Sequence, residues 1–90
     1  MAEAHRLAAL FYTEAGCWEV MLFGSVADHN VRSRDFDIDM AVKGGDFERA
    51  QDIAEQSPFP VDLLDYRKVP AHIRAQIDEY PAIRPPPLDR

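Results

Sequence analysis

The amino-acid sequence predicts one small α/β (α+β) domain, in which helices pack on one face of a short mixed β-sheet. Its 90 residues suffice for one compact core but not for a second domain of ordinary size. Hydrophobic residues make up 47% of the chain, as in globular proteins. Their spacing predicts elements in the order helix, strand, strand, helix, strand, helix, which is typical of a small α/β sandwich.

The first two elements are a helix over residues 4–15 and a strand over residues 20–23. In the helix, apolar residues recur at steps of three and four, and Gly16 is a suitable terminator. The strand is short and wholly apolar, which indicates that both of its faces are covered. It ends at Gly24 and Ser25.

A second strand is predicted over residues 35–42 because apolar and acidic residues alternate there. Side chains in a strand point to opposite faces in turn, so each kind shares one face. The apolar face consists of Phe36, Ile38 and Met40, and the acidic face of Asp35, Asp37 and Asp39.

The rest of the chain predicts a helix, a strand and a last helix. Gly44 and Gly45 end the second strand, and Asp46 suits the N-cap of a helix that runs through residue 56. A break with two prolines leads into a third strand over residues 61–66. The last helix begins at Pro70 and ends before Pro81. The predicted units are a folded domain, residues 1–81, and a Pro-rich tail, residues 82–90.

Composition and charge argue against several kinds of partner and location. There are 16 acidic and 10 basic residues, and the net charge of −6 disfavours direct binding of a nucleic-acid backbone. No apolar stretch approaches the ~18 residues of a membrane span, so we expect no membrane partner. The N-terminus lacks a signal-peptide layout, and the single Cys17 cannot form an internal disulfide. A cytoplasmic location is therefore expected.

Acidic residues supply the predicted chemistry. Asp37 and Asp39 share one strand face, where like charges repel each other and do not stabilise the fold. A hard cation such as Mg²⁺ takes oxygen ligands and would offset this repulsion. Two-metal phosphoryl transfer usually requires a further carboxylate, and Asp62 is the best candidate because its apolar neighbours would face the core. Asp65 is the rival if the strand register differs, and Asp35 is left out of the metal set. Without a metal, the same acids would form a solvated strand face.

Gly24 and Ser25 would form the phosphate side of the same site. Glycine lets the backbone approach a triphosphate, and the Ser25 hydroxyl and neighbouring amides can donate hydrogen bonds to its oxygens. A Gly-Ser pair alone is ordinary turn chemistry, so the prediction depends on its combination with the acidic strands. The basic residues that could offset repulsion of phosphate by Asp28 are Arg32, Arg34 and Lys43.

The sequence resembles the nucleotidyltransferase superfamily of DNA polymerase beta, and most closely its minimal nucleotidyltransferase branch, in the stretch LFGSVADHNVRSRDFDIDMAV and the downstream VDLLDY. The resemblance spans residues 11–80 and implies the fold of that superfamily. In the family a Gly-Ser pair holds triphosphate, both acids of an Asp-x-Asp bind two metal ions, and a third acid helps to activate the attacking hydroxyl. It thus implies nucleotide-binding Gly24 and Ser25 and catalytic, metal-binding Asp37, Asp39 and Asp62.

The resemblance also implies a function. Some members transfer AMP from ATP, with two Mg²⁺ ions, to a tyrosine of a helical HEPN-type toxin, and so act as its antitoxin. One alternative is an inactive module that neutralises a helical partner by binding. A less favoured alternative is nucleotidyl transfer to a small molecule such as an aminoglycoside. Because so short a chain has no separate domain for the base or the acceptor, a partner or a second copy of the chain is expected to complete the site.

Overall fold

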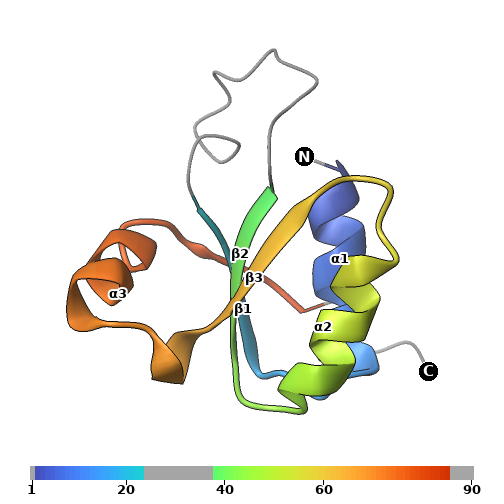
Figure 1. Ribbon diagram of the computed structural model, residues 1–90, viewed down its shortest axis with the longest axis horizontal. Helices are drawn as coiled ribbons and strands as arrows, with labels where there is room; N and C mark the ends of the chain where they lie inside the picture. The colour runs from blue at the N-terminus through green and yellow to red at the C-terminus, as the bar shows by residue number, and fades with distance from the viewer. Residues whose placement is uncertain (1, 24–37, 86–90) are drawn as a thin grey trace.

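The computed structural model describes residues 2–23 and 38–85 (Figure 1). Its elements are α1 (Ala2–Thr13), β1 (Glu19–Phe23), β2 (Ile38–Lys43), α2 (Phe47–Glu55), β3 (Val61–Asp65), the 3-10 turn η1 (Tyr66–Lys68), α3 (Ala71–Ile77) and β4 (Ala82–Ile83). Within these residues the strands form one sheet in the order β3-β2-β1-β4. β1 is antiparallel to β2 and β4, and β2 is parallel to β3. The small mixed α/β fold predicted from the sequence is therefore confirmed. No helix in the described part of the chain is long and apolar enough to cross a bilayer.

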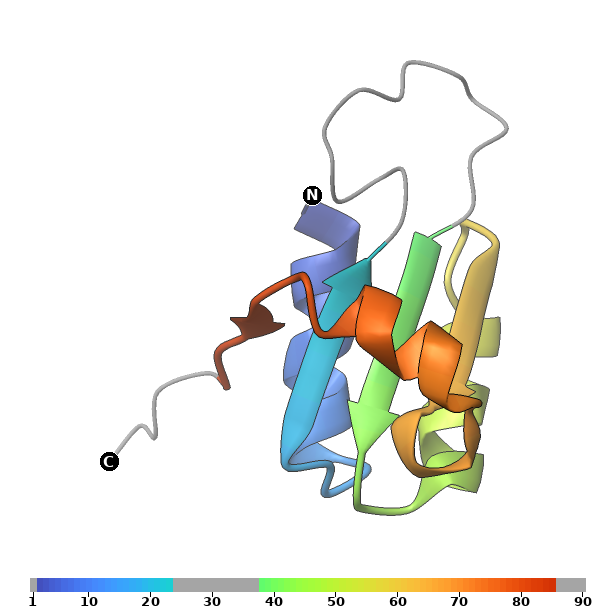
Figure 2. The same ribbon diagram turned by 90° about the vertical axis from the view of Figure 1, so that its left-hand side faces the viewer.

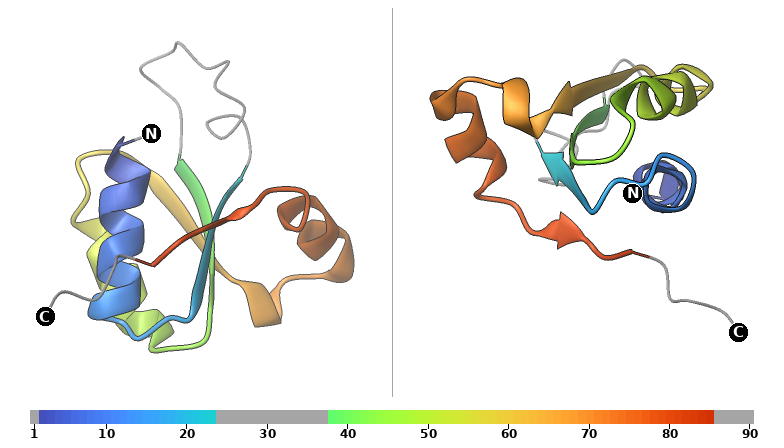
Figure 3. Two further views of the ribbon diagram at one scale, coloured as in Figure 1. Left: turned by 180° about the vertical axis from the view of Figure 1, so that it is seen from behind. Right: turned by 90° about the horizontal axis from the view of Figure 1, so that it is seen from below.

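Helices α1 and α2 cover one face of the sheet (Figure 3). Each presents an apolar stripe at helical spacing, and Leu7 and Phe11 of α1 are completely buried. The alternation expected in β2 is confirmed, because Ile38 and Met40 are also completely buried on this side. The other buried residues of this core are Ala4, Ala8, Ala15, Cys17, Val20, Leu22, Val42, Ala50, Ile53, Ala54 and Leu63.

Helix α3 lies on the opposite face of the sheet (Figures 1 and 3). Its Ile77 is buried against Met21 of β1 and Ala41 of β2, in a second apolar cluster. The expectation that all helices pack on one face is therefore wrong for α3. The physical reason is that β1 and β2 carry apolar residues on both faces, so the second face also needs a cover.

Strand β4 pairs with the outer edge of β1 and is formed by residues assigned above to the tail. Val20 lies opposite Ile83, and Met21 lies opposite Ala82. The Tyr12 hydroxyl accepts a hydrogen bond from the Val20 backbone nitrogen at 3.0 Å and donates one to the Ile83 carbonyl oxygen at 2.5 Å. The Ile83 side chain also packs against the core under α1 and α2. Ala82 and Ile83 are thus part of the sheet.

The turn between β2 and α2 lies against the turn that follows α1. Gly44 and Gly45 end β2 as predicted, with φ of +74° and +73°. The Asp46 backbone nitrogen donates to the Ala15 carbonyl oxygen at 2.8 Å. The Asp46 carboxylate accepts a hydrogen bond from the Arg49 backbone nitrogen at 3.2 Å, which confirms the predicted N-cap of α2.

Candidate functional site

Two members of the predicted acidic set lie side by side on adjacent strands. Asp39 of β2 is directly opposite Asp62 of β3 in the parallel register. Neighbouring strands lie ~4.8 Å apart, and opposite residues of a parallel pair point to the same face. The third predicted acid, Asp37, and the phosphate-binding pair Gly24 and Ser25 lie outside the described residues. We refer to Asp39 and Asp62 below as the acid pair.

The acid pair lies on the face of the sheet that carries α3. Asp39 sits between Ile38 and Met40, which are buried on the other side, and Asp62 precedes the similarly buried Leu63. Asp62 is exposed and Asp39 is half-buried. Figure 2 shows that the starts of β2 and β3 and the end of β1 extend beyond α3. Helix α3 therefore does not extend over this end of the described sheet.

The strand register places the two candidates for the further carboxylate at different distances from Asp39. Asp65 lies opposite Val42, at the other end of β2 from Asp39. Its carboxylate caps η1 by accepting a hydrogen bond from the Arg67 backbone nitrogen at 3.2 Å. Asp65 therefore has a local structural role, and Asp62 is the neighbour of Asp39.

The strand β1 ends next to the acid pair. Phe23, its last residue, lies opposite Asp39 in the antiparallel register. Gly24 follows Phe23 directly in the sequence, and residues 24–37 connect this end of β1 to the start of β2. In the sequence, the Gly-Ser pair therefore begins one residue after a sheet neighbour of Asp39.

The described residues contribute two carboxylates to a metal site but do not complete one. Within residues 2–23 and 38–85, no group of three or more His, Cys, Asp or Glu side chains could hold a metal ion. Mg²⁺ is commonly held by one or two protein carboxylates, with water and phosphate oxygens as its other ligands. The oxygen ligands of the acid pair fit such an ion.

Lys43 is at the far end of β2 from the acid pair. Its Nζ lies 2.5 Å from a carboxylate oxygen of Glu19 and 4.3 Å from the centroid of the Tyr66 ring. The hydrogen bond to Glu19 raises the pKa of Lys43, so the lysine is a cation at neutral pH. Four residues of a strand separate Lys43 from Asp39, or ~13 Å. Lys43 is therefore engaged elsewhere, and the other two basic candidates, Arg32 and Arg34, lie outside the described residues.

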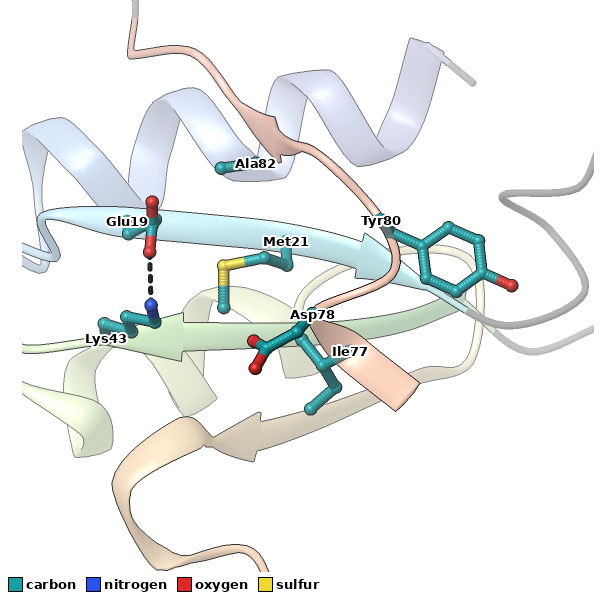
Figure 4. Close-up of a pocket in the computed structure, with 7 residues that line it drawn as sticks. All are labelled: Glu19, Met21, Lys43, Ile77, Asp78, Tyr80 and Ala82. Atoms are coloured by element: carbon teal, nitrogen blue, oxygen red, sulfur yellow. Dashed lines mark ion pairs between the residues drawn. The ribbon is translucent and has the colours of Figure 1, made fainter. Parts of the chain in front are cut away.

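A pocket of about 230 Å³ opens on the α3 face of the sheet (Figure 4). Its walls come from β1, the end of β2, the end of α3 and the segment that leads into β4. The Tyr66 hydroxyl donates a hydrogen bond to the Asp78 carboxylate at 2.7 Å. Sequence reasoning missed this pocket, because no spacing in the sequence brings these distant segments together. The pocket is lined by Glu19, Met21, Lys43, Ile77, Asp78, Tyr80 and Ala82.

No protein-family model, curated protein or solved structure matches this chain. The motif in the sequence and the geometry of the acid pair are therefore the basis for inferring a function. Both concern the same end of the sheet.

Proposed function

We propose that the chain is an Mg²⁺-dependent nucleotidyltransferase that transfers AMP from ATP to a hydroxyl group. The observation that supports this proposal is the register that puts Asp39 opposite Asp62. Two like charges on adjacent strands are unfavourable for folding alone, and a bound divalent cation would make them favourable. By the alternation expected from the sequence, Asp37 would lie on the same face and provide the third carboxylate.

The chemistry follows from the roles of these carboxylates. Asp37 and Asp39 would hold two Mg²⁺ ions, and Gly24 and Ser25 would donate hydrogen bonds to the triphosphate. The ions would neutralise phosphate charge and lower the pKa of the acceptor hydroxyl. Asp62 would take the hydroxyl proton as the acceptor oxygen attacks the α-phosphorus in line. A new oxygen–phosphorus bond forms, the bond to the β-phosphate breaks, and pyrophosphate leaves.

The acceptor that we propose is a tyrosine of a helical HEPN-type toxin in the cytoplasm, for which this chain is the antitoxin. Asp62 lies on β3, which is an edge strand within the described sheet, and its side chain is exposed. A side chain of another protein can therefore reach Asp62 without any opening of the fold. The exposed position of Asp62 supports an acceptor that is delivered by a partner.

The test is to incubate the full chain with its helical partner, ATP and Mg²⁺, and then to weigh both proteins by intact-mass spectrometry. The expected result is one added AMP on the partner. Asp39→Asn and Asp62→Asn should each abolish the addition. Asp52→Asn removes the same charge from an exposed position on α2 and should leave it unchanged. Undiminished transfer by both site variants would overturn the proposal.

Two alternative functions predict different products in the same experiment. A non-catalytic binding module would form a stable complex with the partner but add no AMP to it. A small-molecule nucleotidyltransferase would leave the partner unmodified and add AMP to an acceptor such as an aminoglycoside. Size-exclusion chromatography of the same mixture distinguishes a complex with the partner from a homo-oligomer.

A further inference from the structure

The α3 face of the sheet carries its side chains in rows that run across the strands. The strand registers define two neighbouring rows, which are Phe23, Asp39 and Asp62 in one and Met21, Ala41 and Leu64 in the other. Opposite residues on neighbouring strands point to the same face, with their Cβ atoms ~4.5–5.5 Å apart. The first row therefore consists of the acid pair and one aromatic residue, Phe23, next to Asp39.

Phe23 is held from the side of the second row. Its side chain is half-buried and packs against the buried cluster of Met21, Ala41 and Ile77. Protein interiors are close-packed, so a ring that packs against such a cluster has few alternative rotamers. Ile77 belongs to α3, which does not extend over the acid pair (Figure 2). Helix α3 is nevertheless linked to the first row through the cluster that holds Phe23.

Phe23 restricts the space around Asp39. Asp39 has Phe23 on its β1 side and Asp62 on its β3 side. The ring of Phe23 fills space on the β1 side and offers no charge or hydrogen bond to a carboxylate. Asp39 is half-buried whereas Asp62 is exposed, which agrees with an apolar neighbour on the β1 side. Phe23 thus removes orientations of the Asp39 carboxylate that lead away from Asp62.

A restricted carboxylate matters more for one divalent cation than for another. Mg²⁺ requires near-ideal octahedral geometry with short ligand distances, whereas Ca²⁺ accepts longer distances and irregular geometry. Neighbours that orient a metal ligand commonly change metal affinity by about 10-fold to 100-fold when they are removed. Restriction of Asp39 therefore favours binding of Mg²⁺ over binding of Ca²⁺.

We infer that Phe23 is a positioning residue for the acid pair, which holds the Asp39 carboxylate toward Asp62 and so favours Mg²⁺ over Ca²⁺. This inference rests on the proposed nucleotidyltransferase function. Phe23 acts only through Asp39, and it depends in turn on Ile77 of α3 for its own position. The inference thereby gives α3 an indirect role in the geometry of the site.

The test is calorimetric titration of the full chain with a non-hydrolysable ATP analogue, once in saturating Mg²⁺ and once in saturating Ca²⁺. Phe23→Leu removes the ring but keeps an apolar side chain in the cluster. It should weaken binding of the Mg²⁺ complex by about tenfold and binding of the Ca²⁺ complex by about twofold or less. If Phe23→Leu does not fold, Phe23→Met keeps more of the side-chain volume and has the same expected result.

Met21→Leu is the matched control. Met21 belongs to the same cluster and the same strand face as Phe23, but it lies opposite Ala41 instead of an acid. The control should leave the affinity for each complex within about twofold of the wild-type value. Partial unfolding of a variant weakens both complexes by the same factor, so the ratio of the two affinities separates positioning from loss of structure. Circular dichroism checks that each variant is folded.

Two results would overturn the inference and leave the proposed function standing. One is a folded Phe23→Leu that binds the Mg²⁺ complex as tightly as Met21→Leu does. The other is a Phe23→Leu that weakens the Mg²⁺ and Ca²⁺ complexes by the same factor. A wild-type chain that binds neither complex would refute the proposed function itself, and the inference with it.

Discussion

The hydroxyl of Tyr12 joins β4 to the rest of the sheet. Its removal tests how much these hydrogen bonds contribute to the stability of the β1–β4 edge. The hydroxyl bridges the Val20 backbone nitrogen, at 3.0 Å, and the Ile83 carbonyl oxygen, at 2.5 Å. These two residues face each other in the β1–β4 ladder. Tyr12→Phe keeps the ring in place but deprives two part-buried backbone groups of this partner.

Each lost hydrogen bond should cost about 1 kcal/mol, so Tyr12→Phe should lower the free energy of unfolding by about 2 kcal/mol. For a domain of this size the Tm would fall by roughly 8–16 °C. Urea denaturation and thermal melting followed by circular dichroism measure both quantities. The matched control is Tyr66→Phe, which removes one hydrogen bond at an exposed site and should cost about 0.5 kcal/mol or less. The account of this edge fails if Tyr12→Phe is as stable as Tyr66→Phe.

Two further predictions concern the turns and the acid stability of the fold. Gly45→Ala should cost roughly 3 kcal/mol in urea denaturation and Gly16→Ala roughly 1 kcal/mol. Both glycines have φ of +73°, so the backbone strain of an alanine is similar at the two positions. A Cβ at position 45 would lie 2.5 Å from the Ala15 carbonyl oxygen, whereas a Cβ at position 16 would meet nothing within 4 Å. Equal losses of stability in the two variants would contradict this account. The hydrogen bond from Arg6 outweighs the effect of burial and lowers the pKa of Glu3 from 4.5 to about 2. The stability that Glu3 supplies is therefore present above pH 4.5 and lost as the pH falls from about 4.5 to about 2. In an acid denaturation series, Glu3→Gln should lack this loss of stability. Parallel stability curves for the wild-type chain and Glu3→Gln would refute this prediction.

The fold class was predicted correctly from the sequence. The face of the sheet that each helix covers was not, because it depends on contacts between segments that are far apart in the chain. The helical stripes of α1 and α2 and the alternation of β2 were sufficient to predict the main core. The wholly apolar run at residues 20–23 even indicated that β1 is covered on both faces. Spacing shows which side of a helix is apolar, but it does not show which side of the sheet that helix covers. The position of α3, with Ile77 against Met21, therefore required the structure.

The candidate site was also only partly predictable. The alternation of β2 put Asp39 on the face away from the main core, and the structure agrees. The pairing of Asp39 with Asp62 rather than Asp65 depends on the register between separate strands, which no local pattern determines. Asp78 and Tyr80 escaped notice because the segment after α3 becomes a pocket wall only when β4 joins β1.

The measurement that tests the central claim most directly is calorimetric titration of the chain with a non-hydrolysable ATP analogue, with and without Mg²⁺. We predict Mg²⁺-dependent binding by the wild-type chain, weakened at least about 100-fold in a variant that combines Asp39→Asn and Asp62→Asn, as expected for the loss of two charged ligands. Circular dichroism should show that the variant keeps its fold. Unchanged affinity in the folded double variant, or binding that does not depend on Mg²⁺, would contradict the assignment of the acid pair as a metal and nucleotide site.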